Sequence, residues 1–242
     1  MHNKGYAASS IPPKLSAVAF VHKLLNFPDP TQSFIIQKLV RASRKSQTPD
    51  GRRPITPSIL KALLDAIPSV TSHAYDRQLF KALFLFSYHS LSRIGEVTVT
   101  GAANHTLQLS DINSQASHPH SILVTFRTYK HGNPSRPATI SISPNTGSSY
   151  CPVASLKSYL TIRGNRAGCL FLRSDGRPVS SDLFSHTLRK CVKHVELDPR
   201  EFTAHSFRIG AATHAALSGV PDKQLRALGR WSSDAFRSYI RP

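Results

Sequence analysis

The spacing of hydrophobic residues changes twice along the chain, and this change limits the folds available to it. Between residues 56 and 90 the apolar positions recur every three or four residues, as in helices that bury one face. Between residues 106 and 143 they alternate with polar side chains and include many β-branched residues, which predicts a small sheet. The helical spacing returns from residue 152. This order predicts an α+β fold that is mainly helical.

The same patterns predict the individual elements. Helices are predicted at about residues 14–25, 31–44, 56–67, 74–90, 152–162, 181–196, 204–218, 221–229 and 233–240. Strands are predicted at residues 106–112, 121–129 and 138–143, with 169–172 as an isolated strand. Ser180 and Ser232 are predicted to cap two of the helices.

Residues 42–53 (ASRKSQTPDGRR) contain almost no apolar side chains and are predicted to form a linker. The two helices before it are too small to bury a core of their own. We therefore expect this end of the chain to pack against something else or to belong to a longer domain.

The charge of the chain indicates its class of partner. Thirty-one Lys and Arg residues against thirteen Asp and Glu residues give a formal net charge of +18 over 242 residues. The excess is spread along the whole chain, so it belongs to the folded surface. A polyanion is the expected partner.

Several function classes lack their usual signals in this sequence. No apolar run approaches the ~20 residues of a membrane span, and prolines and charges within residues 11–25 argue against a signal peptide. Cys151, Cys169 and Cys191 lack CxxC spacing, which argues against a disulfide scaffold or a zinc ribbon and fits a reducing compartment. The chain also lacks a P-loop, paired carboxylates and metal-spaced histidines, so we expect no metal and no other cofactor.

Basic and hydrogen-bonding side chains interrupt the helical segments at three places. These are Ser92–Glu96 (SRIGE), Ala204–Ala212 (AHSFRIGAA), and Leu228–Trp231 (LGRW) followed by Tyr239. His205 and Arg208 are three residues apart and would share a helix face. Lys130 falls at the mouth of the predicted hairpin.

Gathered in space, such groups would form a pocket for a phosphate in its trigonal-bipyramidal transition state. Guanidinium groups bind phosphate oxygens in pairs and stay charged at any working pH. A tyrosine beside them would attack phosphorus and release a 5′-hydroxyl, provided that its neighbours offset an ordinary pKa of about 10. Lys130 would then act as the general acid for the leaving oxygen.

The order of these groups resembles the catalytic signature of the tyrosine recombinases, the phage integrase family. The flanking stretches RIGE, AHSFRIGAATHAA and GRWSSDAFRSYIR are most similar to recombinases of DIRS-type retrotransposons of animals. The resemblance covers about residues 54–242. It implies an integrase-like catalytic domain at 56–242 that is truncated after the nucleophile, a linker at 49–55 and a partial helical core-binding (SAM-like) domain at 1–48.

The resemblance also implies an activity: metal-independent DNA cleavage and rejoining, as in site-specific recombination and DNA integration, through a 3′-phosphotyrosyl intermediate. The family acts on double-stranded DNA as a tetramer and uses no cofactor, and its eukaryotic character implies a nuclear location. The catalytic residues implied are Arg93, Lys130, His205, Arg208, Trp231 and Tyr239.

Within this set, the resemblance gives each side chain a role. Arg93 and Arg208 would hold the scissile phosphate, and His205 would assist Tyr239. Trp231 would donate its indole N–H to the phosphate. Lys130 would protonate the leaving oxygen, and Glu96 would support Arg93.

Two assignments stay open at this stage. The sixth catalytic position falls on Arg230 when the family's usual nine-residue spacing is counted back from Tyr239, and on Trp231 when it is counted from Arg208; we favour Trp231. His131 or Arg136 is an alternative to Lys130 at the hairpin. The residues expected to contact DNA are Arg41, Arg44, Lys45, Arg52, Arg53 and Arg230.

Three other functions compete with DNA cleavage. The main alternative is a catalytically inactive DNA-binding remnant of a mobile-element recombinase, which the shortened ends favour. An RNA-binding protein is disfavoured because the few aromatic residues form no stacking motif. A type IB topoisomerase would share the chemistry but would relax supercoils without a paired site.

Overall fold

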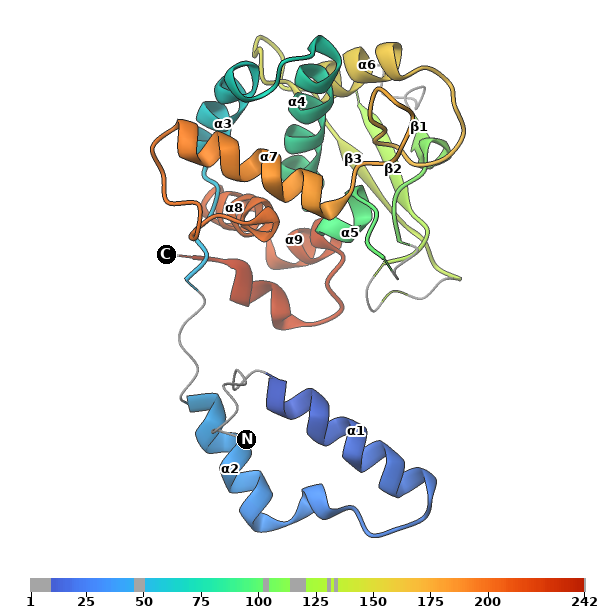
Figure 1. The fold of residues 1–242 in the computed structure, drawn as a ribbon, viewed down its shortest axis with the longest axis vertical. Helices are drawn as coiled ribbons and strands as arrows, with labels where there is room; N and C mark the ends of the chain where they lie inside the picture. Colours follow the sequence, from blue (N-terminus) through green and yellow to red (C-terminus); the bar gives the residue numbers. More distant parts are fainter. Residues whose placement is uncertain are drawn as a thin grey trace. The chain divides into compact units, whose positions relative to one another are not determined.

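The computed structural model describes residues 10–45, 51–101, 105–113, 121–129, 132 and 135–241. The chain divides into two compact units, Met1–Gly51 and Arg52–Pro242 (Figure 1). Each unit is described by itself below. Among the described residues, no helix is both long enough and apolar enough to cross a membrane.

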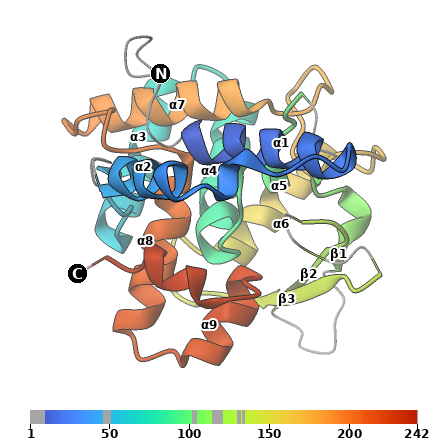
Figure 2. The same ribbon diagram turned by 90° about the horizontal axis from the view of Figure 1, so that it is seen from below.

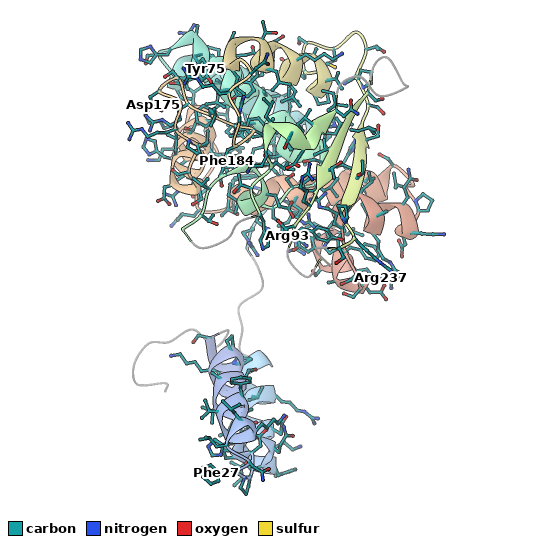
Figure 3. The ribbon with its side chains drawn as sticks, turned by 90° about the vertical axis from the view of Figure 1, so that its right-hand side faces the viewer. Phe27, Tyr75, Arg93, Asp175, Phe184 and Arg237 are labelled. Carbon is teal, nitrogen blue, oxygen red and sulfur yellow. The ribbon has the colours of Figure 1, made fainter. Side chains whose placement is uncertain are left out.

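The first unit consists of two helices joined by a short turn. Helix α1 spans Ile11–Leu24 and helix α2 spans Phe34–Lys45, with the 3-10 helix η3 at Pro30–Gln32 between them. The second helix begins later than predicted because Asp29 caps η3, accepting a 2.9 Å hydrogen bond from the N–H of Thr31. No residue of α1 is buried, and Phe20 and Phe27 are 66% and 60% exposed (Figure 3 labels Phe27).

The second unit contains most of the helices. In chain order they are α3 (Pro57–Val70), α4 (Ala74–His89), α5 (Ile94–Val97), α6 (Pro152–Arg163), α7 (Ser181–His194), α8 (Ala204–Leu217), α9 (Asp222–Gly229) and the 3-10 helix η5 (Asp234–Tyr239). Ser180 caps α7 as predicted, but Ser233 rather than Ser232 caps η5. Figures 1 and 2 show α4 in the middle of the unit, where it packs against α3, α6 and α8.

A small antiparallel sheet lies on the side of this unit away from α3 (Figure 1). Its strand order is β1 (Ile112–Asn113), β2 (Ile122–Phe126) and β3 (Ala138–Ile142). Ile122 pairs with Ile142 and Phe126 with Ala138, so the alternate side chains of β2 from Ile122 to Phe126 enter the core. The predicted fold class, mainly helical with a small antiparallel sheet, is confirmed.

The first predicted strand, at residues 106–112, is wrong over most of its length. Gln108 makes only an isolated bridge to Cys169, and the 3-10 helix η4 follows at Leu109–Asp111. The cause is Asp111, whose carboxylate accepts a 2.9 Å hydrogen bond from the N–H of Gln108 and thereby turns the chain. This local bond replaces a strand ladder.

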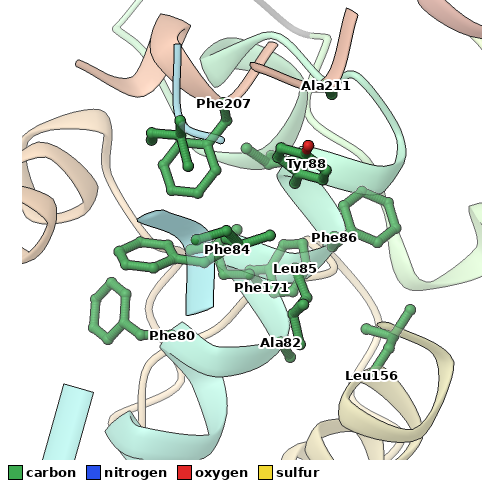
Figure 4. Packing of buried hydrophobic residues seen from close by; sticks show 14 of the residues in the cluster. Phe80, Ala82, Phe84, Leu85, Phe86, Tyr88, Leu156, Phe171, Phe207 and Ala211 are labelled. Atoms are coloured by element: carbon green, nitrogen blue, oxygen red, sulfur yellow. The ribbon is translucent and has the colours of Figure 1, made fainter. Parts of the chain in front are cut away.

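Aromatic side chains fill the core between the helices. Phe84 of α4 lies 5.1 Å from Phe207 of α8 and 5.3 Å from Phe184 of α7, measured between ring centroids. Phe86 lies 5.5 Å from Phe171 on the other side of α4 (Figure 4). These packed rings hold α8, which carries two of the predicted catalytic residues, against the centre of the unit.

An extended segment before α3 lies directly on α8. The N–H of Arg53 donates to the carbonyl of Glu201 at 2.9 Å, and the N–H of Ile55 donates to the carbonyl of Ser206 at 3.1 Å. A Cβ atom on Gly210 would lie only 1.9 Å from the Ile55 carbonyl oxygen. Position 210 therefore has no room for a side chain.

Gly210→Ala is expected to lower the free energy of unfolding by about 1–3 kcal/mol, the usual effect of overpacking a closely fitted contact. Urea unfolding of the purified protein measures this change. Gly101→Ala is the matched control, because a Cβ atom there meets nothing within 4 Å. Equal stability of the two variants would contradict the described contact between α8 and residue 55.

Candidate active site

The first predicted catalytic residue, Arg93, stands at the N-terminus of α5. Its N–H donates to Oε2 of Glu96 at 2.8 Å, and its guanidinium donates to Oε1 of Glu96 at 3.1 Å. The side chain of Arg93 is 21% exposed, whereas that of Glu96 is 2% exposed. Glu96 therefore holds Arg93 from beneath the surface, in the position that its predicted supporting role requires.

Helix α8 contributes His205 and Arg208 from its first two turns. Thr203 caps the helix, accepting a 3.2 Å hydrogen bond from the N–H of His205. The Arg208 side chain is completely buried, and its guanidinium donates to the carbonyls of Leu91 and Gly229, the latter at 2.5 Å. Arg208 thus joins the loop before Arg93 to the end of α9.

Arg230 lies inside the protein, which sequence reasoning did not foresee. Its side chain is 0% exposed, and its guanidinium donates to Oε2 of Glu96 at 2.7 Å and to the Ser90 carbonyl at 3.1 Å. The guanidinium carbon also lies 3.6 Å from the centroid of the Phe126 ring. The side chain of Arg230 therefore has no exposed surface in this structure with which to contact DNA, and a structural role fits this side chain better than the predicted contact.

The backbone of Arg230 explains how the chain makes room for this side chain. Its φ of 55° is left-handed and ends α9, a conformation that costs a residue with a Cβ atom free energy. Leu91, whose carbonyl accepts hydrogen bonds from both Arg208 and Arg230, also has a positive φ, of 48°. Neither conformation carries a signal in the sequence, because neither residue is a glycine or an asparagine.

Positive charge exceeds negative charge in this buried cluster. Three guanidinium groups, those of Arg93, Arg208 and Arg230, surround the single carboxylate of Glu96. Burial together with the charges of Arg93 and Arg230 lowers the pKa of Arg208 to about 9, so the group remains charged near neutrality. Burial alone would raise the pKa of Glu96, but the arginine charges and the N–H of Arg93 lower it from 4.5.

A cavity of about 380 Å³ lies over this cluster. Its walls include Arg93, His205, Arg230, Trp231 and Tyr239. The ring of Tyr239 lies 4.9 Å from the ring of His205 and 5.1 Å from that of Trp231, between centroids. In Figure 3, Arg93 lies toward the same end of the unit as Arg237 from η5. The fold thus brings together four residues that the sequence analysis predicted to be catalytic.

Trp231 covers Arg208 in this structure. The Arg208 guanidinium carbon lies 4.1 Å from the centroid of the indole ring, and the ring also lies so close to Gly229 that a Cβ atom on Gly229 would be 1.7 Å from it. Within the described part of the chain, the buried Nε of Arg208 and Nε1 of Trp231 have no hydrogen-bond partner. Arg208 is therefore beneath the cavity and is not part of its wall.

A second cavity, of about 870 Å³, adjoins the first, because Ile94 and His205 belong to the walls of both. It is lined by three further arginines, Arg52, Arg189 and Arg200. Only Arg52 was predicted to contact DNA. Arg189 and Arg200 were missed because a single arginine on an exposed helix or loop carries no distinguishing pattern.

The remaining predicted residues are placed as follows. Lys130 and its alternative His131 lie outside the described residues, as do the side chains of Arg44 and Lys45. Arg41 is exposed on α2, and Arg136 is exposed before β3. Arg53 is exposed and forms a 3.3 Å ion pair with Glu201.

Among the residues that the structure describes, no group of three or more His, Cys, Asp and Glu side chains is placed to hold a metal ion.

This fold, with an arginine, a histidine and a tyrosine around one cavity, defines an integrase-type catalytic domain. The chain belongs to the Phage integrase family, whose sequence profile matches residues 54–240. A comparison with curated proteins gave no match.

Three solved structures of similar fold have matches that extend over almost all of this chain. The integrase of transposon Tn1549 in complex with transposon right end DNA is 16% identical, with a TM-score of 0.67 and coverage of 100% of this chain and 78% of that one. The lambda integrase dimer bound to a COC′ core site is 17% identical (TM-score 0.62, coverage 97% and 59%). XerA recombinase is 17% identical (TM-score 0.59, coverage 99% and 73%).

The chain spans about half, 49%, of the XerH site-specific recombinase in its post-cleavage complex with DNA. That match covers 78% of this chain at 13% identity and a TM-score of 0.58. At such low identities these likenesses show the fold alone.

Glu96→Gln is expected to lower the free energy of unfolding at pH 7 by about 3–5 kcal/mol, the usual cost of removing one partner from a buried ion pair. Folding lowers the pKa of Glu96 from 4.5, so the carboxylate stabilises the protein fully above pH 4.5 and loses this effect as the pH falls through its folded-state pKa. The gap between wild type and variant should therefore narrow below pH 4.5.

Urea unfolding at neutral and acidic pH measures this gap. Glu201→Gln serves as the control, since its ion pair with Arg53 is exposed at the surface and contributes less than about 1 kcal/mol. A gap that stays constant over the whole pH range would show that the charge of Glu96 contributes nothing.

Proposed function

We propose that this protein cleaves and rejoins double-stranded DNA through a covalent bond to Tyr239. The observation that carries the proposal is the 380 Å³ cavity, whose walls hold Arg93, His205, Trp231 and Tyr239 above a cluster with excess positive charge. A phosphodiester would supply the negative charge that this cluster lacks. Membership of the Phage integrase family supports the same reaction class.

In this reaction the Tyr239 hydroxyl oxygen attacks phosphorus, and the bond from phosphorus to the 5′-oxygen breaks. A 3′-phosphotyrosine and a free 5′-hydroxyl result, so the bond energy is kept for rejoining. The imidazole of His205, 4.9 Å from the Tyr239 ring between centroids, is close enough to assist removal of the phenol proton. We assign protonation of the 5′-oxygen to Lys130, as the sequence predicts. Rejoining is the reverse attack by a 5′-hydroxyl.

The arginines would stabilise the charge that develops on the phosphate oxygens. Arg93 reaches the cavity directly, whereas Arg208 requires the Trp231 ring to move aside. We propose that this movement offers the unpaired Nε of Arg208 and Nε1 of Trp231 to the phosphate. Trp231 then fills the sixth catalytic position, and Arg230 holds Glu96 from within.

We place the duplex across the larger cavity beside the site. Arg52, Arg189 and Arg200 line it, and phosphate contacts of this kind dominate affinity for DNA. The relatives from Tn1549 and lambda are described as bound to DNA, which supports the same partner here.

Several finer assignments rest on the resemblance of the sequence. We propose that residues 1–48 form part of a core-binding domain whose residues Arg41, Arg44 and Lys45 contact the duplex. We also propose assembly as a tetramer on DNA, an origin in a DIRS-type retrotransposon and a nuclear location.

A second function, DNA binding without cleavage, is favoured by one observation. Arg208 is covered by Trp231 and has no surface in the cavity. If that cover never moves, the protein would bind DNA through its basic surface and leave the phosphate uncleaved.

Tyr239→Phe is expected to abolish a covalent protein–DNA adduct that the wild type forms. The substrate is a pool of labelled duplexes with random sequence and a nick that lets the cleaved fragment diffuse away. The adduct is read on a denaturing gel. Tyr150→Phe is the matched control, because Tyr150 donates its hydroxyl to Asp65 and lines neither of the two cavities, so this variant should keep full activity.

The same gel, read beside a measurement of duplex binding at increasing salt concentration, separates the alternatives. Duplex binding that weakens steeply with salt, without any adduct in the wild type, would establish the DNA-binding remnant. An adduct that persists in Tyr239→Phe would mean that another residue is the nucleophile.

A further inference from the structure

One hydroxyl group holds the backbone at the proposed nucleophile, Tyr239, and two residues after it, at Arg241. Thr213 of α8 is 8% exposed. Its Oγ1 donates to the carbonyl of Tyr239 at 3.2 Å and accepts from the N–H of Arg241 at 3.0 Å. A threonine hydroxyl has one donor and two acceptor positions, so it can make both bonds at once.

The position of Thr213 on α8 gives this contact its importance. The same helix carries His205 and Arg208, eight and five residues earlier. A helix rises about 1.5 Å per residue and is stiff over this length. Thr213 therefore sets the Tyr239 backbone at a fixed distance from the side chains that would act on the phosphate.

Other contacts hold the beginning and middle of η5, and the Tyr239 ring at its end packs against His205 and Trp231. The Phe236 ring is completely buried and anchors the middle of the element. Two ion pairs join η5 to α9, Asp234 with Arg226 at 3.0 Å and Arg237 with Asp222 at 3.2 Å. Their side chains are largely exposed, and such pairs contribute little. The two Thr213 bonds act on the backbone here, one on the carbonyl of Tyr239 itself and the other on the N–H of Arg241.

We propose that Thr213 is a positioning residue for Tyr239 and that its hydroxyl sets the reach of the phenol oxygen to the scissile phosphate. This inference rests on the proposed function, since it concerns the same nucleophile. Thr213 touches neither the substrate nor the reacting atoms, so it acts through the backbone of residues 239–241. Displacement of a reacting group by about 1 Å is enough to slow a reaction ~100-fold.

The test compares Thr213→Val, which keeps the shape and removes both hydrogen bonds, with Thr213→Ser, which keeps the hydroxyl. Adduct formation on the nicked duplex pool is measured at saturating DNA. We expect Thr213→Val to slow it by about 10- to 100-fold at unchanged DNA affinity, and Thr213→Ser to restore most of the rate. Thr187→Val is the matched control, because Thr187 is a buried helical threonine that donates only to the Leu183 carbonyl in α7.

A second readout does not depend on catalysis. Hydrogen exchange of the Arg241 amide should be slow in the wild type and in Thr213→Ser, and fast in Thr213→Val. A fast-exchanging Arg241 amide in the wild type would overturn the contact itself. Equal adduct rates for Thr213→Val and Thr187→Val, or a Thr213→Ser variant as slow as Thr213→Val, would overturn the positioning role. A protected Arg241 amide in a wild type that forms no adduct would instead refute the proposed function.

Discussion

The structure depends on the burial of two guanidinium groups, those of Arg208 and Arg230, near the buried carboxylate of Glu96. A buried charge is costly unless it is paired or hydrogen-bonded. Arg230 is paired with Glu96 and also donates to the Ser90 carbonyl, whereas Arg208 donates to the carbonyls of Leu91 and Gly229. The carbonyl of Leu91 accepts from both arginines, at the cost of a left-handed backbone. The loop before α5, the end of α9 and the last residue of β2 are thereby brought together around one centre.

This centre explains why the cavity has the side chains that it has. The guanidinium of Arg93 donates to Oε1 of Glu96, and that of Arg230 donates to Oε2 of the same carboxylate, so the buried Arg230 helps to orient the group that holds Arg93. Helix α8 supplies His205 above the centre and Arg208 within it, and its close approach to residue 55 at Gly210 keeps the helix in place. The excess of positive charge is then directed to the cavity that Tyr239 borders. An anion in that cavity would complete the charge balance of the interior.

The sequence predicts most of the helices and the class of fold, because periodicity is a local property, but the four-residue helix α5 (Ile94–Val97) is not predicted. The ordered motifs, and the resemblance that they carry, predict that Arg93, His205, Trp231 and Tyr239 lie together. The sequence fails to predict the structure where a side chain forms a specific hydrogen bond that the apolar pattern does not reveal, whether with a near neighbour or with a residue far along the chain. Asp111 turns a predicted strand into a 3-10 helix through a bond to its own backbone neighbour, and Arg230 enters the core because Glu96, far earlier in the sequence, receives it. The stacking of Trp231 on Arg208 is equally invisible, since it depends on how the chain leaves α9. The two spacing rules disagree over whether residue 230 or 231 fills the sixth catalytic position. In the fold, the Arg230 side chain lies within the core, whereas the Trp231 side chain lines the cavity and covers Arg208.

The proposed function requires the cavity above this arginine cluster to bind a tetrahedral oxyanion. A crystal structure with tungstate, which stands in for the phosphate and is located by its anomalous scattering, tests it most directly. We expect one tungstate within hydrogen-bonding distance of both Arg93 and Arg208. The Trp231 ring should have moved off the Arg208 guanidinium, and the Tyr239 hydroxyl should face the ion. A cavity that stays empty at saturating tungstate, or an ion bound there while Trp231 still covers Arg208, would contradict it.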